Sequence, residues 1–205
     1  MSGRFIVFEG IDGSGKTTQT KMLAEALRSK GYKVTLTAEP TELPTGRALR
    51  QALGGGVKLS ECQMATLFVE DRIAHNIEPE AGIQAIVDRG EIVICDRYYY
   101  STLAYQGHST DYDWVKSMNL ACPEIRKPDL CVYIDLLPEQ SLERIAKGRD
   151  SVEIYENTDT LTRVRRQFLS VIEDIGQTDK ICVVDGYRTP DQVAADVLRV
   201  VESVL

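Results

Sequence analysis

The chain has 205 residues, a formal net charge of −7 at pH 7, and 43% hydrophobic residues. This length suits one domain over residues 1–205 with a full hydrophobic core. Lysine and arginine are scattered and form no dense basic stripe, so we expect no nucleic-acid polymer as a partner. The sequence has no apolar run long enough to span a membrane, and its first residues enter a strand without a signal-peptide pattern. We therefore expect a cytoplasmic protein without a membrane anchor.

Cysteine usage agrees with a reducing compartment. The chain contains five cysteines, and no two of them form a C-x-x-C pair. Three lie inside apolar runs typical of strands, so we expect buried, reduced thiols and no structural metal. The cysteines are Cys62, Cys95, Cys122, Cys131 and Cys182.

Short apolar runs alternate with helical patterns along the chain. Strands are predicted over residues 4–9, 33–38, 91–96, 130–135 and 180–185. Several are continuous runs of Val, Ile, Leu and Cys, which are typical of parallel strands buried on both faces. Helices are predicted over residues 15–30, 46–53, 61–77, 81–89, 98–106, 112–120, 138–147, 158–176 and 190–204. This order predicts a doubly wound α/β fold, in which a five-stranded parallel sheet has helices on both faces and ligands bind beyond the carboxyl ends of the strands.

The first predicted strand runs directly into a phosphate-binding pattern. Residues 10–17 read G-I-D-G-S-G-K-T, which fits G-x-x-x-x-G-K-[ST]. The glycines let backbone N–H groups turn toward the phosphates of a nucleotide, and the next helix presents its positive end. Lys16 is expected to reach the β- and γ-phosphates, and Thr17 to bind Mg²⁺. The predicted nucleotide-binding residues are Gly10, Asp12, Gly13, Ser14, Gly15, Lys16, Thr17 and Thr18.

The alternative, a plain glycine-rich turn, requires neither the lysine nor the hydroxyl at these offsets. A phosphate loop alone still leaves kinases, GTPases and motor or transport ATPases open. The guanine-reading pattern N-K-x-D is missing from the sequence, which argues against a GTPase. Asp96 and Arg97 end the third predicted strand, across from the phosphate loop. We expect Asp96 to hold the water shell of Mg²⁺ and Arg97 to bridge phosphates, with a plain surface ion pair as the alternative.

Residues 96–107, D-R-Y-Y-Y-S-T-L-A-Y-Q-G, carry a more specific pattern. They resemble the signature D-R-[YFH]-x-x-S-x-x-A-[YF]-Q of thymidylate kinases, the P-loop nucleoside-monophosphate kinases that phosphorylate dTMP. Three further stretches resemble that family in the right order. They are residues 8–19 around the phosphate loop, Glu39-Pro40 followed by Gly46 and Arg50, and residues 67–75, which are similar to L-[FY]-x-A-D-R-x-x-H. The resemblance covers nearly the whole chain and implies the P-loop NTPase fold with a lid.

The same resemblance implies the layout of a dTMP site. Phe68 and Arg72 are four residues apart on a helix, so the ring can stack on thymine while the guanidinium reaches O4. Core packing is the alternative for Phe68. Tyr105 is expected beneath C2′, where its ring leaves no room for a ribose hydroxyl. The predicted substrate-binding residues are Asp12, Glu39, Arg50, Phe68, Arg72, Arg97, Ser101, Thr102, Tyr105 and Gln106.

Within this set, the family resemblance assigns Arg50 and Arg97 to the acceptor phosphate and Asp12 to the sugar 3′-hydroxyl. Thr102 and Gln106 share a helical face and are expected at the pyrimidine edge. Outside the set, we expect His75 to be structural and Asp71 to orient Arg72 or to cap a local network.

Residues 144–156 are predicted to form a lid over the phosphates. Phosphoryl transfer spreads negative charge over the moving group, and the phosphate loop itself supplies no arginine to meet it. Arg149 is the first candidate for that role and Arg144 the second. Arg163 and Arg166 are available to the donor phosphates or to adenine, although a solvated helix face explains any one of these cations equally well.

The sequence therefore predicts a dTMP kinase that uses ATP and Mg²⁺, with Lys16, Asp96, Arg97 and Arg149 as catalytic residues. The family resemblance also implies a homodimer. A kinase for another monophosphate or a deoxynucleoside would keep the phosphate loop and Asp96-Arg97, but should not keep Phe68, Arg72 and Tyr105 in this register. A regulatory P-loop ATPase would need a residue that activates water, and the sequence offers no obvious one.

Overall fold

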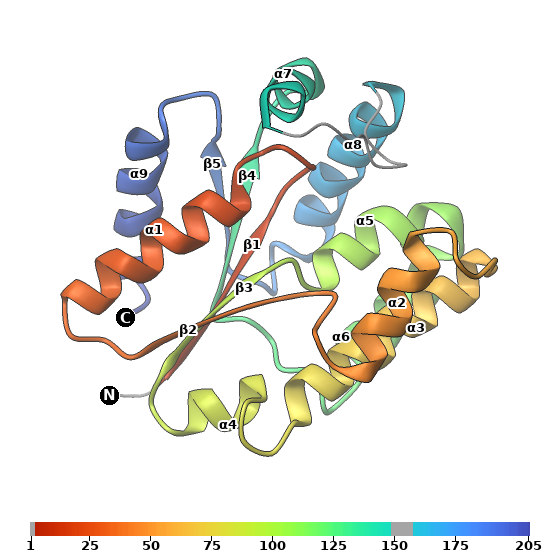
Figure 1. The fold of residues 1–205 in the computed structure, drawn as a ribbon, viewed down its shortest axis with the longest axis horizontal. Coiled ribbons are helices and arrows are strands. Elements are labelled where there is room, and N and C mark those ends of the chain that lie inside the picture. Colours follow the sequence, from red (N-terminus) through yellow and green to blue (C-terminus); the bar gives the residue numbers. More distant parts are fainter. Residues whose placement is uncertain (1–2, 149–157) are drawn as a thin grey trace.

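Five strands form one parallel sheet at the centre of the protein (Figure 1). The computed structural model describes residues 3–148 and 158–205. The strands are β1 (Arg4–Glu9), β2 (Val34–Ala38), β3 (Ile92–Asp96), β4 (Leu130–Asp135) and β5 (Ile181–Asp185). Their order across the sheet is β2-β3-β1-β4-β5, and every neighbouring pair is parallel. The predicted doubly wound sheet is thus confirmed, with each strand bound within one residue of its predicted place.

The helices of the described chain also follow the prediction. They are α1 (Lys16–Ser29), α2 (Pro44–Leu53), α3 (Glu61–Ile77), α4 (Ile83–Asp88), α5 (Tyr99–Ser109), α6 (Tyr112–Leu120), α7 (Pro138–Gly148), α8 (Thr158–Ile175) and α9 (Pro190–Glu202). Two bounds differ for clear reasons. Helix α2 begins at Pro44, because proline is well suited to the first helical position. Helix α5 continues through Gly107, where an added Cβ would stand 2.9 Å from the Tyr112 ring, so this glycine serves close packing and does not end the helix.

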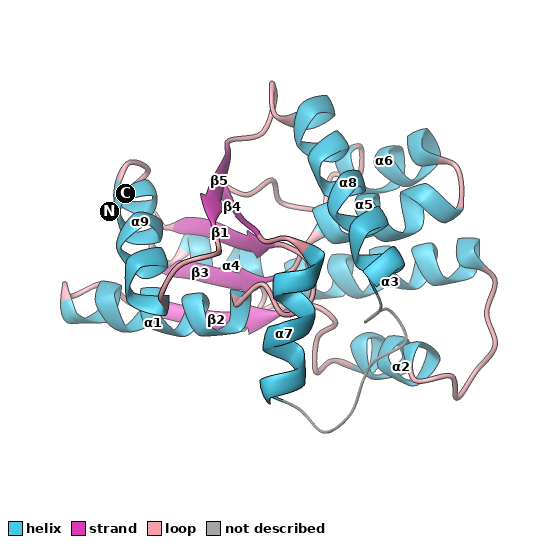
Figure 2. Ribbon diagram, turned by 90° about the horizontal axis from the view of Figure 1, so that it is seen from above, coloured by secondary structure: helices cyan, strands magenta, loops and turns pink. Residues whose placement is uncertain are grey.

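The sheet separates two apolar layers (Figure 2). Side chains alternate along β1, so Phe5 and Val7 face one layer while Ile6 and Phe8 face the other. Helices α1 and α9 cover the second face, and α4, α5 and α8 cover the first. Each such fully buried side chain contributes about 1.5–3 kcal/mol, so the two layers hold the sheet edges at the site in a fixed arrangement.

The strand order reverses at β1, whose neighbours are β3 and β4. In open α/β sheets such a switch point leaves a crevice beyond the carboxyl ends of the strands. The segments that leave the sheet there are the loop of residues 10–15 after β1, the Arg97 turn after β3 and the start of α7 after β4. The ligand site is therefore expected at this edge.

The cysteine prediction is right in part. All five thiols are free. Cys95 and Cys131 are buried in strands, whereas Cys182, in the edge strand β5, and Cys122 are only half-buried. Cys62 is exposed, because it lies in the first turn of α3 and points away from the core. Within the described ranges, no helix has the length and apolar character needed to cross a membrane.

Candidate active site

A cavity of about 600 Å³ opens at the switch point, a size suited to a nucleotide-like ligand. Its wall combines residues from the phosphate loop, α2, α3 and α5. These residues are Asp12, Glu39, Pro40, Arg50, Leu53, Gly54, Phe68, Arg72, Arg97, Tyr98, Ser101, Tyr105 and Gln106. The described part of the chain thus brings every predicted substrate-binding residue to this wall except Thr102, which is fully buried behind Arg72.

The phosphate loop has the backbone that its glycines predict. Gly10, Gly13 and Gly15 have φ angles of 145°, 75° and 99°, in a region that other residues rarely adopt. An added Cβ on Gly13 would stand 2.8 Å from Ser141 Oγ and 2.9 Å from Ile145, so α7 packs directly on the loop. The loop therefore lies between β1 and α7 with little room to move.

Lys16, the first residue of α1, is buried beneath the phosphate loop. Only 7% of the residue is exposed. Its Nζ donates to the backbone oxygens of Gly10 at 3.0 Å and Ile11 at 2.9 Å, because the loop curls around its own lysine. Burial, with a further contribution from nearby Arg97, lowers the pKa of Lys16 to about 8.

The two residues predicted to hold Mg²⁺ contact each other directly. Thr17 Oγ1 donates to Asp96 Oδ2 at 2.7 Å, which joins the start of α1 to the end of β3. A hydroxyl and a carboxylate are hard oxygen ligands, and Mg²⁺ typically takes one or two such ligands plus waters and phosphate oxygens. Among the described residues no group of three or more His, Cys, Asp or Glu side chains could hold a metal ion.

Arg97 lies at the end of the cavity next to the phosphate loop. Its side chain forms an ion pair with Asp12, donates to Ser101 Oγ at 2.9 Å, and lies 5.7 Å from the centre of the Tyr105 ring. Burial opposes the charge on Asp12, but Arg97 and Lys16 outweigh it and lower the pKa of that carboxyl. Asp12, Arg97 and Tyr105 thus form one charged group on the cavity wall.

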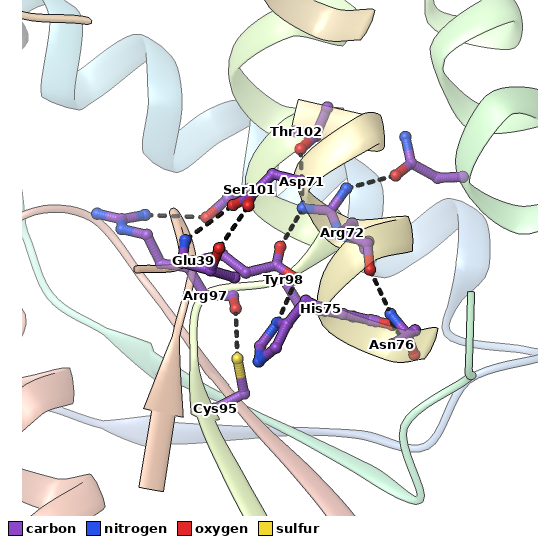
Figure 3. Close-up of polar contacts among 12 residues, drawn as sticks. Glu39, Asp71, Arg72, His75, Asn76, Cys95, Arg97, Tyr98, Ser101 and Thr102 are labelled. Atoms are coloured by element: carbon purple, nitrogen blue, oxygen red, sulfur yellow. Dashed lines mark hydrogen bonds and ion pairs between the residues drawn. The ribbon is translucent and has the colours of Figure 1, made fainter. Parts of the chain in front are cut away.

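Arg72 lies at the other end of the cavity and is held from three sides (Figure 3). Only 1% of the residue is exposed. Its Nη2 donates to Glu39 Oε2 at 2.6 Å and to Thr102 Oγ1 at 3.2 Å, while Nη1 donates to Asn119 Oδ1 at 2.5 Å. Its Nε is buried and has no partner among the described residues. Since arginine has five N–H donors, the guanidinium still has donors for an acceptor in the cavity.

Two sequence neighbours of Arg72, Asp71 and His75, have structural roles. His75 Nδ1 lies 3.0 Å from Glu39 Oε1, and its Nε2 lies 2.8 Å from Thr37 Oγ1, so His75 is structural as expected. Asp71 points away from Arg72 and accepts hydrogen bonds from the Thr41 backbone and from Thr45 Oγ1, both at 2.8 Å. Of its two expected roles, Asp71 has the second, because it caps the loop between β2 and α2.

The segment after β2 places Arg50 on the wall. Gly46 packs against the Thr41 backbone so closely that an added Cβ would stand 2.0 Å from Thr41 O. One turn later Arg50 Nη1 donates to Pro40 O at 2.7 Å, and its Nη2 lies 2.8 Å from Glu42. The glycine and arginine of this motif thus fold the α2 segment over the cavity.

Of the predicted lid, the structure describes only residues 144–148. Arg149 and residues 150–156 of the predicted lid lie outside the described residues. Arg144, on α7, donates to Ser14 O at 3.2 Å and to Gly186 O at 2.7 Å, so its guanidinium lies on the phosphate loop. Arg163 and Arg166 are exposed on α8. Of the two candidate cations, Arg144 is the one that the structure describes, and it contacts the phosphate loop.

Three residues of the site were missed by the sequence analysis. Asn119 holds Arg72, and Arg165 forms a two-pronged ion pair with Asp135 at the end of β4, at 2.7 and 2.8 Å. Glu9 lies buried beside the phosphate loop. Glu9 had a usable signal, since it is an acidic residue at the end of an otherwise apolar strand. Asn119 and Arg165 have no comparable local signal.

A phosphate loop beside a nucleotide-sized cavity lined by arginines is the arrangement expected of a P-loop kinase whose acceptor is itself a nucleotide. Comparison with known proteins narrows the class: the family model for thymidylate kinase matches residues 8–197. The chain belongs to the thymidylate kinase family.

Individual relatives agree with the family match. A probable thymidylate kinase of Pyrococcus horikoshii is 36% identical over 98% of this chain and 97% of the relative. One of Methanococcus aeolicus is 39% identical over 83% of this chain and 80% of the relative. A thymidylate kinase of Leptospira borgpetersenii is 34% identical over 96% of this chain and 92% of the relative.

Proposed function

We propose that the cavity between α2, α3 and α5 binds dTMP, while ATP binds on the phosphate loop next to it. The chain transfers the γ-phosphoryl group of ATP to dTMP, which gives ADP and dTDP for dTTP biosynthesis. One observation carries the site assignment: Phe68, Arg72, Arg97 and Tyr105 line a single cavity that adjoins the phosphate loop through Asp12. A kinase for another acceptor would not be expected to have these four side chains on one cavity wall.

The reaction asks little covalent chemistry of the protein. The acceptor is a phosphate oxygen that is already ionised at neutral pH, so no general base is required and no phosphoenzyme forms. The protein aligns the two phosphates and neutralises the charge that spreads over the moving group. Lys16 and Arg97 supply two of the cations for this task, and both lie beside Asp12 at the junction of the two sites.

A lid arginine completes the charge neutralisation. We assign this role to Arg149 and propose that residues 144–156 close over the phosphates and exclude water. Arg144 is the alternative, because its guanidinium already contacts the phosphate loop. Arg163 and Arg166 remain available for the donor nucleotide.

Mg²⁺ would be held by Thr17 and Asp96, whose oxygens already lie within hydrogen-bonding distance of each other. When bound, the ion would neutralise charge on the donor phosphates. The remaining residues of the phosphate loop, from Gly10 to Thr18, would bind the phosphates through their backbone N–H groups.

At the base end, Phe68 would stack on thymine, and Arg72 would donate to O4 from the N–H groups that Glu39, Asn119 and Thr102 leave free. Gln106 lies on the same wall and would contact the pyrimidine edge. At the sugar, Tyr105 would exclude a 2′-hydroxyl and Asp12 would accept the 3′-hydroxyl. Arg50 and Arg97 would hold the acceptor phosphate.

We further propose that residues 1–205 work as one domain and that the enzyme acts in the cytoplasm. Five free cysteines support a reducing compartment.

We also propose that the enzyme is a homodimer, as its family membership suggests. Equilibrium sedimentation measures the oligomeric state directly, and a monomer at all concentrations would contradict the dimer.

An ADP-release assay against a panel of nucleoside monophosphates tests the proposal. The purified chain, ATP and Mg²⁺ are combined with dTMP, dUMP, dCMP, dAMP, dGMP or no acceptor. We expect dTMP to give the highest kcat/KM and the reaction without acceptor to be negligible. A higher kcat/KM for another monophosphate would reassign the acceptor. Equal ADP release without any acceptor would point to a P-loop ATPase.

A further inference from the structure

Glu9 is a fully buried carboxylate at the last position of β1, directly before Gly10 of the phosphate loop. A buried carboxylate is costly unless hydrogen bonds satisfy its oxygens. The partners of Glu9 all lie near the start of α5. Its Oε1 accepts from the backbone N–H groups of Tyr98 at 2.8 Å and Ser101 at 3.1 Å, and its Oε2 accepts from Ser101 Oγ at 2.7 Å.

Glu9 therefore caps a helix that starts almost ninety residues later in the chain. Tyr98 is the N-cap residue of α5, and within the described residues it makes no side-chain capping hydrogen bond. The first N–H groups of a helix have no partner inside the helix, so a carboxylate at this end satisfies them and also interacts favourably with the helix dipole. Glu9 supplies that carboxylate from the neighbouring strand.

Arg97 lies between Glu9 and the start of α5. It is the one non-glycine residue of the described chain with a positive φ angle, 70°, a conformation that is unfavourable for any residue with a Cβ atom and requires support from its surroundings. Its backbone N–H donates to Phe8 O at 2.9 Å, next to Glu9. Its Nη1 donates to Ser101 Oγ at 2.9 Å, as Figure 3 shows.

The Ser101 hydroxyl thus connects two charges. It donates its proton to Glu9 and accepts a hydrogen bond from Arg97. A side chain at position 9 that presents a donor instead of the Glu9 oxygen would leave the Ser101 hydroxyl without its acceptor. The hydroxyl could then turn away from Arg97. The guanidinium of Arg97 is thus held on one side by Asp12 and on the other by the Ser101 hydroxyl, whose own acceptor is Glu9.

We propose that Glu9 is a positioning residue for phosphoryl transfer, which aims Arg97 at the acceptor phosphate through the Ser101 hydroxyl and the first turn of α5. This role for Glu9 rests on the proposed function, in which Arg97 contacts that phosphate. Because Glu9 and Gly10 are adjacent, the same contact fixes the distance between the donor loop and the acceptor arginine. Ser101 then acts on the substrate through Arg97, in addition to any direct contact.

Two variants break this link in different ways. Glu9→Gln keeps the size of the side chain and an oxygen for the two backbone N–H groups. Its NH₂ group then faces Ser101, and because NH₂ is a donor it cannot accept the hydroxyl proton. Ser101→Ala removes the hydroxyl and leaves Glu9 with its backbone partners. Asp179→Asn is the matched control: Asp179 is also a buried carboxylate that accepts from the first turn of α5, through Tyr100 Oη at 2.8 Å, but it has no contact with Arg97 among the described residues.

The measurements are kcat and KM for each substrate, the Kd of dTMP by calorimetry, and thermal unfolding. We expect Glu9→Gln and Ser101→Ala each to weaken dTMP binding and to lower kcat/KM for dTMP by about tenfold, the effect of losing one well-placed charged hydrogen bond. KM for ATP should change less than about twofold, since the phosphate loop keeps its backbone. Asp179→Asn should leave the Kd of dTMP unchanged even where it lowers the unfolding temperature.

A double-mutant cycle separates positioning from general damage. In an Arg97→Met background, Glu9→Gln should change the Kd of dTMP less than about twofold, because the arginine that it positions is gone. A full tenfold effect in that background would overturn the role of Glu9, and so would an unchanged Kd in both single variants. If Glu9→Gln fails to fold, the same cycle is run with Ser101→Ala. Failure of the wild-type chain to bind dTMP would instead overturn the proposed function, so the two failures are distinguishable.

Discussion

The two ends of the proposed site differ in what holds their cations. At the base end, Arg72 is surrounded by Glu39, Thr102 and Asn119, and these contacts need not change when a ligand binds. At the phosphate end, Lys16 donates to the backbone of its own loop, and Arg97 pairs with Asp12. The acceptors of Lys16 are thus two backbone oxygens of the loop, and the acceptor of Arg97 is a carboxylate.

The difference follows from what each end must recognise. A base offers one or two weak acceptors, so discrimination requires an arginine whose position is fixed before binding. A phosphate brings full charge and can displace weaker protein acceptors from Lys16. We conclude that the base end is preorganised, whereas at the phosphate end Lys16 exchanges protein contacts for substrate contacts.

The largest effect is expected for Lys16→Ala. Loss of the cation at the transferred phosphoryl group should lower kcat by at least about 10²–10³-fold, the range for removal of one preorganised electrostatic contact. The ligand-free variant should be no less stable than the wild type in urea, because the substitution removes a buried charge. Single-turnover kinetics measure the first quantity, and turnover near the wild-type level would show that Lys16 does not reach the phosphates.

The two arginines can be compared by the free energy of unfolding that is lost when each is replaced. Arg72→Met leaves Glu39 buried without its partner and should lower the free energy of unfolding by about 3–5 kcal/mol. Arg97→Met removes a partly exposed pair, in which the side chains of Arg97 and Asp12 are 20% and 26% exposed. Its cost should stay below about 1 kcal/mol. Urea denaturation of the ligand-free proteins compares them, and equal losses would remove the distinction between the two ends.

Tyr105→Ala tests the sugar part of the site. The ring should reject 5-methyl-UMP, which has a 2′-hydroxyl, by about tenfold to two-hundredfold in kcat/KM relative to dTMP. The variant should narrow this ratio because the clash is relieved, although dTMP itself binds less tightly. Parallel assays of both acceptors with both proteins give the ratio. A wild type that accepts the two equally, or a ratio that the variant leaves unchanged, would place the acceptor differently.

The smallest expected effect is the uptake of protons when a nucleotide binds. Since burial lowers the pKa of Lys16 to about 8, part of the lysine is neutral above that pH in the ligand-free protein. Phosphates favour its charged form, so ADP binding at about pH 8.5 should take up a fraction of a proton. Calorimetry in buffers of different ionisation enthalpy measures this uptake. Lys16→Arg, which stays charged, is the control and should show none from this group; uptake identical in both proteins would assign the proton elsewhere.

Local patterns were sufficient to predict the sheet, its order of elements and the phosphate loop, because strand periodicity and glycine spacing report on nearby residues. Helical spacing also placed Phe68 and Arg72 on one face of α3, whereas the place of Tyr105 on the same cavity wall followed from the family resemblance and not from spacing. They could not predict that Lys16 is buried, because the loop that covers it curls in three dimensions. The contacts of Arg72 with Asn119 and of Glu9 with Ser101 join distant segments, and no local signal encodes such pairs.

The most direct test of preorganisation is the NMR signal of the Arg72 guanidinium in the ligand-free protein. Rotation about the Nε–Cζ bond averages the Nη signals of a free arginine, whereas an arginine held on both Nη groups gives separate signals. With Glu39 and Thr102 on Nη2 and Asn119 on Nη1, Arg72 should show separate Nη signals before any dTMP is added, and dTMP should shift mainly the Nε signal. Averaged Nη signals that separate only when dTMP binds would show that the substrate, and not the protein, organises the base end.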